Sequence, residues 1–136
     1  MTTKSSGFSL IELLVVVAIL GVLSAIGISS YSGYIASSEK KAAENIMQQI
    51  SLGQTEYYSG NGSYYSASSG NCSPTTITST AIETNLLGGA DAISADLNYE
   101  MCIQSHASNY MVKAKAKKGT CEITMTAHGT FTRKNC

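Results

Sequence analysis

The sequence is poor in charge, histidine and proline, and each shortage narrows the kinds of protein that it can encode. Charged residues make up 13% of the 136 residues, and nine basic residues balance nine acidic ones. Without a basic excess, nucleic-acid binding is not the default interpretation. The two histidines, His106 and His128, lack metal-ligand spacing, so we expect surface histidines and neither a metal nor a cofactor. No triad, paired-carboxylate or phosphate-cradling pattern is visible, which argues against an enzyme.

The cysteines also lack the spacing of a metal or redox site. None of the four, at Cys72, Cys102, Cys121 and Cys136, belongs to a Cys-x-x-Cys pair. An even number that follows a hydrophobic segment predicts two disulfides formed in an oxidising compartment. Four cysteines allow three pairings, and the residues alone do not choose among them.

The amino-terminal part holds a long apolar run with one carboxylate inside it. Leu10 to Ile28 contains thirteen Leu, Ile or Val residues, and Glu12 is the only charged side chain between Phe8 and Ser38. The apolar residues favour membrane insertion by about 4–8 kcal/mol, whereas one carboxylate opposes it by at most ~3 kcal/mol. We therefore predict a spanning helix with Glu12 in place. A removed signal peptide, a plain stop-transfer anchor and a snorkelling Glu12 are the alternatives.

The stretch GFSLIELLVVVAILG, from Gly7 to Gly21, resembles the class III signal of type IV pilins and related pseudopilins. The resemblance implies that a prepilin peptidase cuts between Gly7 and Phe8 and methylates the new amino group of Phe8. Glu12 lies one helical turn further on, where it can face the amino terminus of a neighbouring subunit. Pairing would recover part of the cost of an acid in lipid, so this charge would favour correctly staggered assembly.

Helical spacing continues beyond the apolar run. Ile35, Ala42, Ile46 and Ile50 recur at intervals of seven or four, with further apolar residues alongside, and a glycine-rich stretch follows from Gly53. Many type IV pilins carry a helix-kinking proline after the apolar stretch, but the only proline here is Pro74. Gly21, Gly27 and the serine pair that follows can still loosen the helix, so the resemblance implies local melting in a fibre between Gly21 and Ser30.

A loop and then an antiparallel sheet are expected after the helix. Ser59 to Thr80 has the composition of a loop, and we expect its tyrosines to pack it onto the helix rather than to bind carbohydrate. Period-two alternation then predicts strands near 99–104, 110–117 and 121–127, with a last short strand near 130–133. The apolar face of this sheet should cover the outer half of the helix.

The expected fold is therefore α+β: a long helix packed on a small antiparallel sheet, which is the type IV pilin architecture. The boundaries are a leader at 1–7, a helix at 8–58 whose part 8–30 is transmembrane and later filament core, an αβ-loop at 59–98, and the sheet with a disulfide loop at 99–136. By resemblance, the carboxy-terminal disulfide is Cys121–Cys136, which leaves Cys72 with Cys102.

The resemblance implies a structural subunit of a bacterial type IV pilus, serving adhesion, twitching motility or DNA uptake. Its partners would be copies of itself, the prepilin peptidase and, indirectly, an inner-membrane assembly platform with its ATPase motor. The precursor would be a single-pass inner-membrane protein with a periplasmic carboxyl end, and the product an extracellular pilus. The alternatives are a type II secretion pseudopilin, a minor pilin and, from another class, a membrane-tethered enzyme or receptor.

A row of lysines suggests one further binding partner. Lys113, Lys115, Lys117 and Lys118 form a basic strand edge, and such lysines usually solvate an outer face or protect an edge. Contact with DNA during uptake is the alternative interpretation.

Overall fold

The computed structural model describes residues 7–136 except 69, 95–96 and 107. Helix α1 spans Leu10–Asn61 and helix α2 spans Thr76–Leu86. Four strands follow, β1 at Tyr99–His106, β2 at Asn109–Ala116, β3 at Glu122–Thr126 and β4 at Phe131–Lys134. The chain divides after Ser38 into two compact units, each of which is described on its own.

The first unit is the amino-terminal part of α1. Its side chains are exposed throughout, including Leu10 at 74% and Ile28 at 68%. The helix is long and apolar enough to cross a membrane, and none of its apolar stretch is buried within the protein. An apolar surface of this size needs lipid or another chain to cover it.

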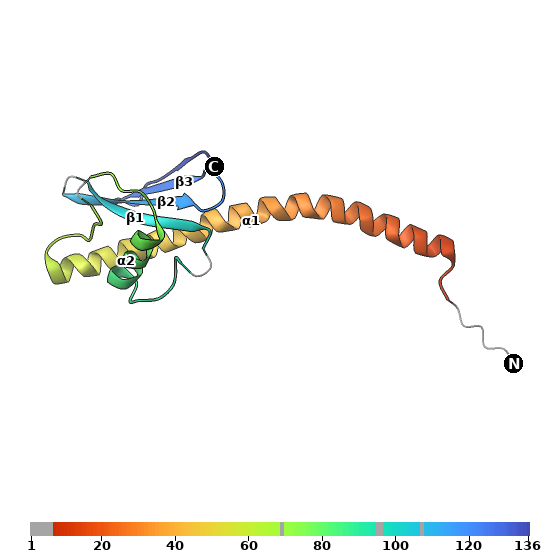
Figure 1. Cartoon of the computed structure of the whole chain (residues 1–136), viewed down its shortest axis with the longest axis horizontal. Coiled ribbons are helices and arrows are strands. Elements are labelled where there is room, and N and C mark those ends of the chain that lie inside the picture. Colours follow the sequence, from red (N-terminus) through yellow and green to blue (C-terminus); the bar gives the residue numbers. More distant parts are fainter. Residues whose placement is uncertain (1–6, 69, 95–96, 107) are drawn as a thin grey trace. The chain divides into compact units, whose positions relative to one another are not determined.

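The second unit contains a four-stranded antiparallel sheet in the order β1-β2-β3-β4, with the second part of α1 against one of its faces (Figure 1). This confirms the α+β fold predicted from the sequence. The core lies between α1 and this sheet face, and it takes Ala43, Met47 and Ile50 from the helix. Alternate strand residues, such as Val112 and Ile123, are fully buried against them. The period-two burial pattern of β2 and β3 arises because one face packs on the helix and the other remains polar.

Polar and aromatic contacts hold the segment that follows α1. Gln54 is fully buried, and its side-chain amide accepts from the Tyr65 N–H (2.8 Å) and donates to the Tyr65 carbonyl (2.7 Å). The Tyr64 ring packs against Tyr58 at 4.7 Å and against Tyr110 of β2 at 4.9 Å between centroids. These tyrosines therefore fasten the segment to the helix and the sheet.

Helix α2 lies inside the segment for which the sequence predicted only a loop, so that prediction missed a helix. Thr75 is its N-cap and forms a capping box with Thr78, which the sequence shows only as two threonines three residues apart. The buried Ser79 accepts from the Met101 N–H at 2.9 Å, which attaches α2 to the edge of β1. At Gly53 of α1, an added Cβ would lie 2.5 Å from the Leu86 carbonyl oxygen, so the close approach of the two helices requires glycine there.

A buried carboxylate on α2 orders the segment that follows it. Glu83 is 2% exposed and accepts from the Ile93 N–H at 3.2 Å and from the Ser94 hydroxyl at 2.9 Å. The chain between them turns through Gly88 and Gly89, both with positive φ. Glu83 therefore satisfies donors that would otherwise be buried without a partner.

We expect Glu83→Gln to lower the free energy of unfolding by about 1–2 kcal/mol, because the Ile93 and Ser94 donors bind a charged carboxylate more strongly than a neutral amide. Urea unfolding of the full chain in detergent, followed by tyrosine fluorescence, measures the change. Glu56→Gln, at an exposed position of α1, is the matched control. An unchanged midpoint for Glu83→Gln would contradict this role.

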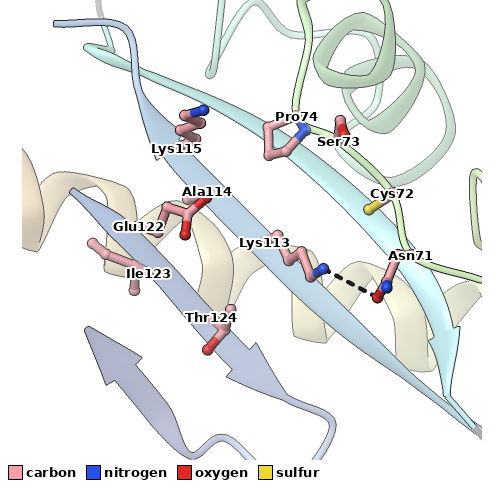
Figure 2. Close-up of a pocket in the computed structure, with 10 residues that line it drawn as sticks. All are labelled: Asn71, Cys72, Ser73, Pro74, Lys113, Ala114, Lys115, Glu122, Ile123 and Thr124. Carbon is pink, nitrogen blue, oxygen red and sulfur yellow. Dashed lines mark hydrogen bonds between the residues drawn. The ribbon is translucent and has the colours of Figure 1, made fainter. Parts of the chain in front are cut away.

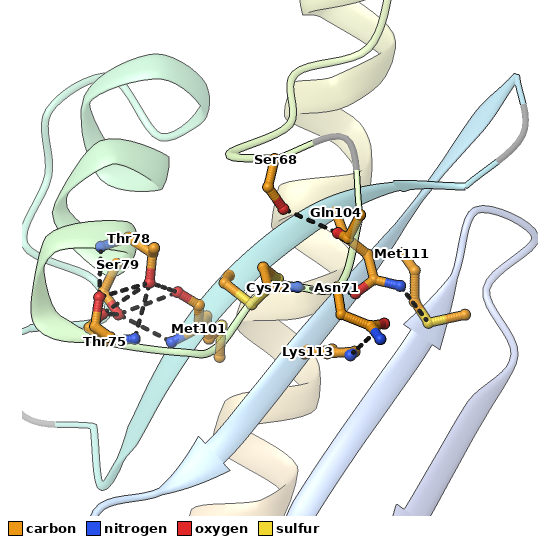
Figure 3. The surroundings of a disulfide bond; sticks show 12 residues. Ser68, Asn71, Cys72, Thr75, Thr78, Ser79, Met101, Gln104, Met111 and Lys113 are labelled. Carbon is orange, nitrogen blue, oxygen red and sulfur yellow. Dashed lines mark hydrogen bonds between the residues drawn. A yellow bond between two sulfur atoms is a disulfide. The ribbon is translucent and has the colours of Figure 1, made fainter.

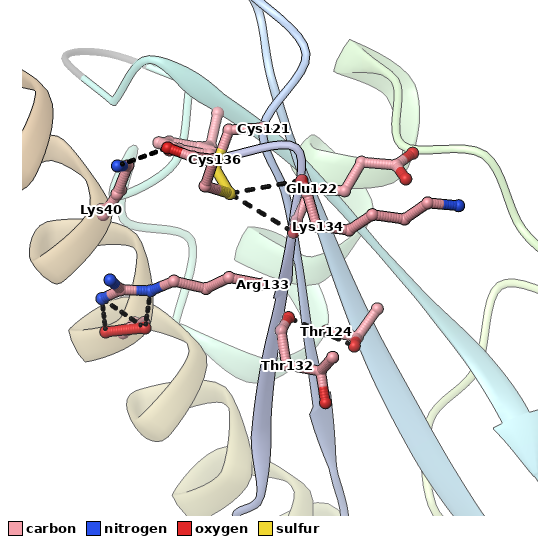
Figure 4. Close-up of polar contacts among 10 residues, drawn as sticks. Lys40, Cys121, Glu122, Thr124, Thr132, Arg133, Lys134 and Cys136 are labelled. Carbon is pink, nitrogen blue, oxygen red and sulfur yellow. Dashed lines mark hydrogen bonds and ion pairs between the residues drawn. A yellow bond between two sulfur atoms is a disulfide. The ribbon is translucent and has the colours of Figure 1, made fainter.

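Two disulfides join Cys72 to Cys102 and Cys121 to Cys136. Figure 4 shows the second disulfide with Arg133 of β4 nearby. The Arg133 guanidinium forms an ion pair with the Glu44 carboxylate of α1 at a distance of 2.9 Å. The Tyr99 hydroxyl donates to Cys121 Sγ at 3.3 Å. Burial raises the pKa of this hydroxyl, and the charge of nearby Glu39 acts in the same direction, so the group remains a donor at neutral pH.

Candidate functional site

The amino-terminal end of α1 brings together the first group of predicted site residues. Gly7 and Phe8 immediately precede the helix, and the Phe8 side chain is 82% exposed. Ser9 caps the helix: its hydroxyl accepts from the Glu12 N–H, and the Glu12 carboxylate accepts from the Ser9 N–H, both at 3.2 Å. This reciprocal pair is a capping box.

The capping box gives Glu12 a local partner that the sequence prediction did not include. The carboxylate has room for more than one hydrogen bond, and among the residues that the structure describes it binds one N–H, that of Ser9. A second donor, in particular a cation, could therefore bind the same group. Placing an acid in the first turn also favours the helix through its dipole.

The second candidate site lies on the outer face of the sheet, defined as the face directed away from α1. The register aligns two rows of outward residues across the strands. One row runs Cys102, Lys113, Thr124 and Thr132; the other runs Glu100, Lys115, Glu122 and Lys134. The first row is neutral apart from one cation, whereas the second alternates in charge.

A hollow of about 340 Å³ opens on this face between the segment 71–74 and the strands β2 and β3 (Figure 2). One wall of the hollow is formed by Asn71, Ser73 and Pro74. The β2 side of the lining is formed by Lys113 and Lys115. Glu122 and Thr124 of β3 complete the lining. The Lys113 ammonium lies 3.5 Å from the Asn71 side-chain oxygen, which joins the segment to the strand.

The lysine charges of the outer face remain available to a ligand. Among the residues that the structure describes, the one ion pair within 4 Å joins Arg133 to Glu44, which leaves Lys115, Lys117 and Lys118 without an ion pair at that distance. Lys115, Lys117 and Lys118 are exposed, whereas Lys113 is half-buried beside the segment 71–74. An anion with several charged groups could therefore contact these lysines together.

The wall of the hollow is fixed to the edge of β1 at several points (Figure 3). Cys72 is held by its disulfide to Cys102, and its N–H donates to the buried Gln104 side chain at 3.2 Å. Further along, the Ala67 N–H donates to the Ile103 carbonyl at 2.8 Å. The segment thus covers the edge of β1, which would otherwise present unpaired backbone groups.

Other candidates from the sequence do not form a site. His106 and His128 are both exposed, and no group of three potential metal ligands occurs among the described residues. Sequence reasoning missed Asn71 and Glu122 as neighbours of the lysines. Glu122 could have been found by continuing the outward pattern across strands, but nothing in the sequence places Asn71 above β2.

Known protein families match both the amino-terminal part of the chain and the part that contains the sheet. Residues 2–28 match a family model described as a prokaryotic N-terminal methylation motif. Residues 29–136, most of the chain, match a model described as type IV minor pilin ComP, DNA uptake sequence receptor. The fold and the amino-terminal motif define a type IV pilin, and the chain belongs to the ComP family of these pilins.

The curated relatives match only part of this chain. Fimbrial protein EcpC of Eikenella corrodens is 43% identical over 56 residues, 41% of this chain and 37% of that protein. Type IV major pilin protein PilE1 of Neisseria gonorrhoeae is 36% identical over 64 residues, 47% of this chain and 39% of its own length. The alignments thus cover less than two fifths of these relatives. No solved structure matches the chain significantly.

Proposed function

We propose that this chain is a subunit of a bacterial type IV pilus that, as a minor pilin, binds double-stranded DNA through the outer face of its sheet. One observation carries the proposal: the region that matches a family described as a DNA uptake sequence receptor contains a hollow bordered by lysines. The alternative that the sequence left open, a minor pilin, is thereby favoured over a major pilin or a pseudopilin.

The amino-terminal part serves assembly in this proposal. Prepilin peptidase cleaves between Gly7 and Phe8 and methylates the amino group of Phe8, as the methylation motif supports. The precursor is held in the inner membrane by the apolar part of α1, with its carboxyl end in the periplasm. The assembly platform and its motor then transfer the helix into the core of the extracellular filament. Mass spectrometry of the mature chain tests the step, since its amino terminus should be N-methylated Phe8.

The outer face supplies the electrostatic part of DNA binding. Phosphates of a duplex release counterions when lysines neutralise them, so binding should weaken steeply with salt. Lys115, Lys117 and Lys118 are exposed and follow one another along β2 and the turn after it. Glu100 and Glu122 flank Lys115 and limit the positive potential. Binding through this face should therefore be moderate without additional contacts to the bases.

The triple variant Lys115→Gln, Lys117→Gln and Lys118→Gln tests this function. We expect its affinity for a short duplex to fall at least tenfold at physiological salt, and its slope of log affinity against log salt to fall by about 3, one per phosphate contact. Fluorescence anisotropy of labelled DNA with the full chain in detergent measures both. Lys41→Gln, on the exposed side of α1, is the control. A triple variant with unchanged affinity and slope would rule out this face.

A second candidate is a pilus subunit that serves adhesion or motility without binding DNA. It is favoured by the identity to type IV major pilin protein PilE1 over 47% of this chain. A major subunit should be the most abundant component along isolated fibres, whereas a minor pilin should be scarce. Quantitative mass spectrometry of sheared fibres separates the two.

A further inference from the structure

Asn71 is the residue of the hollow whose side chain offers both a donor and an acceptor in a fixed plane. Its oxygen accepts from the Lys113 ammonium at 3.5 Å, which places the amide nitrogen on the side away from that cation. The oxygen keeps a second lone pair and the nitrogen keeps its hydrogens. A group with this pattern can bind the edge of a base through two hydrogen bonds, whereas a phosphate would use only its donor.

The position of Asn71 is restrained by its neighbours in the chain. Cys72, the next residue, is bonded to Cys102, and its N–H is bound by Gln104. On the other side, the Ser68 hydroxyl donates to the Gly70 carbonyl at 2.9 Å. Side chains that recognise ligands work best when the surrounding structure holds them in place before binding.

Glu122 makes one side of the hollow unfavourable for a phosphate, although Lys113 and Lys115 line the hollow as well. It lies on the β3 wall, across from the segment that carries Asn71 (Figure 2). A carboxylate repels a phosphate and also the O6 acceptor that guanine presents in the major groove, but it does not repel the exocyclic amino group of adenine. Phosphates are better placed against Lys117 and Lys118, which are exposed and do not line the hollow.

We propose that the hollow recognises an adenine in the major groove, with Asn71 as the residue that determines specificity. The amide nitrogen donates to adenine N7 and the amide oxygen accepts from N6, the bidentate pairing that asparagine makes with this base. Lys113 orients the amide. This inference rests on the proposed function, because it assumes that the outer face binds duplex DNA.

The experiment begins with selection from a pool of duplexes that share constant ends and a randomised centre. The full chain in detergent is the binding protein, and enriched sequences are read by sequencing. We expect the wild-type chain to enrich a motif with an adenine at one position or more. For Asn71→Ala we expect that adenine preference to disappear, while binding to the unselected pool changes less than about twofold and the salt slope is unchanged.

Base analogues then test the hydrogen bonds. Replacing the selected adenine by 7-deazaadenine removes the N7 acceptor, and we expect the affinity of the wild-type chain to fall about tenfold, the usual range for one bidentate base contact. The same replacement should cost Asn71→Ala almost nothing, because the contact is already absent. Asn61→Ala, an exposed asparagine at the end of α1, is the control and should keep the wild-type motif.

Each contrary outcome has a distinct meaning. If the wild-type chain binds the pool with normal salt dependence but enriches no motif, or if Asn71→Ala keeps the adenine, the inference is wrong and DNA binding stands. If Asn71→Ala instead changes a preference for guanine, we assign that preference to Lys113, and the inference about adenine is again wrong. If no duplex binds at all, the proposed function itself fails.

Discussion

Glu12→Gln is expected to leave membrane insertion intact and to reduce incorporation into pili by about a hundredfold. Glutamine can accept from the Ser9 N–H, so the capping box persists and the start of α1 is unchanged. Only the charge is lost. If the carboxylate pairs with the amino group of Phe8 in a neighbouring subunit, its loss leaves a buried cation unpaired, which costs about 3 kcal/mol.

The measurement compares the amounts of variant and wild-type chain in sheared pili with their amounts in membranes. Ser9→Ala is the matched control, because it removes the cap hydroxyl and keeps the charge. Its expected cost is about 1 kcal/mol, and it should incorporate far better than Glu12→Gln. Mass spectrometry confirms that both variants begin at Phe8. Normal incorporation of Glu12→Gln would show that the charge has no part in assembly.

The double variant Cys72→Ser and Cys102→Ser is expected to have the largest effect on the second unit. The two cysteines are 30 residues apart, and a loop of that size predicts a loss of about 3–4 kcal/mol in the free energy of unfolding. The same bond holds the wall that carries Asn71. We therefore expect the variant to lose its preference among duplexes even where it remains folded.

Urea unfolding and the selection experiment measure the two effects separately. The control is the double variant Cys121→Ser and Cys136→Ser, whose loop of 15 residues predicts a loss of about 3 kcal/mol. That bond joins the two ends of the β3–β4 hairpin next to Glu122 and does not hold the segment 71–74 that carries Asn71, so this control should keep its duplex preference. If both double variants keep the preference equally, the wall does not depend on its disulfide.

Local patterns were sufficient to predict most of the fold. The apolar run, the helical spacing after it and the alternation in three strands are properties of neighbouring residues, so periodicity reveals them directly. Helix α2 was missed because it is rich in threonine and offers few apolar residues, with Ile82 fully buried and Ile77 82% exposed. Its clearest signal, the Thr75–Thr78 cap, resembles ordinary loop sequence.

The candidate hollow could be predicted only in part. Outward alternation places Lys113 and Lys115 on one face, but it does not show what lies above them. Asn71 is 42 residues away from Lys113 in the chain. Its position depends on the disulfide at Cys72 and on the hydrogen bond to Gln104, both of which are contacts between distant segments.

The sequence by itself determined the anchor, the single acid within it and the alternating strands, because each depends on which residues are close in the chain. Residue patterns alone left three disulfide pairings open, the resemblance to type IV pilins implied Cys72–Cys102, and nothing placed a side chain above the lysines. Only the tertiary structure showed that the segment held by the Cys72–Cys102 bond places the Asn71 amide beside the Lys113 ammonium on the outer face. The physical reason is that sites between distant segments depend on how the chain closes on itself, and loop closure leaves no local pattern.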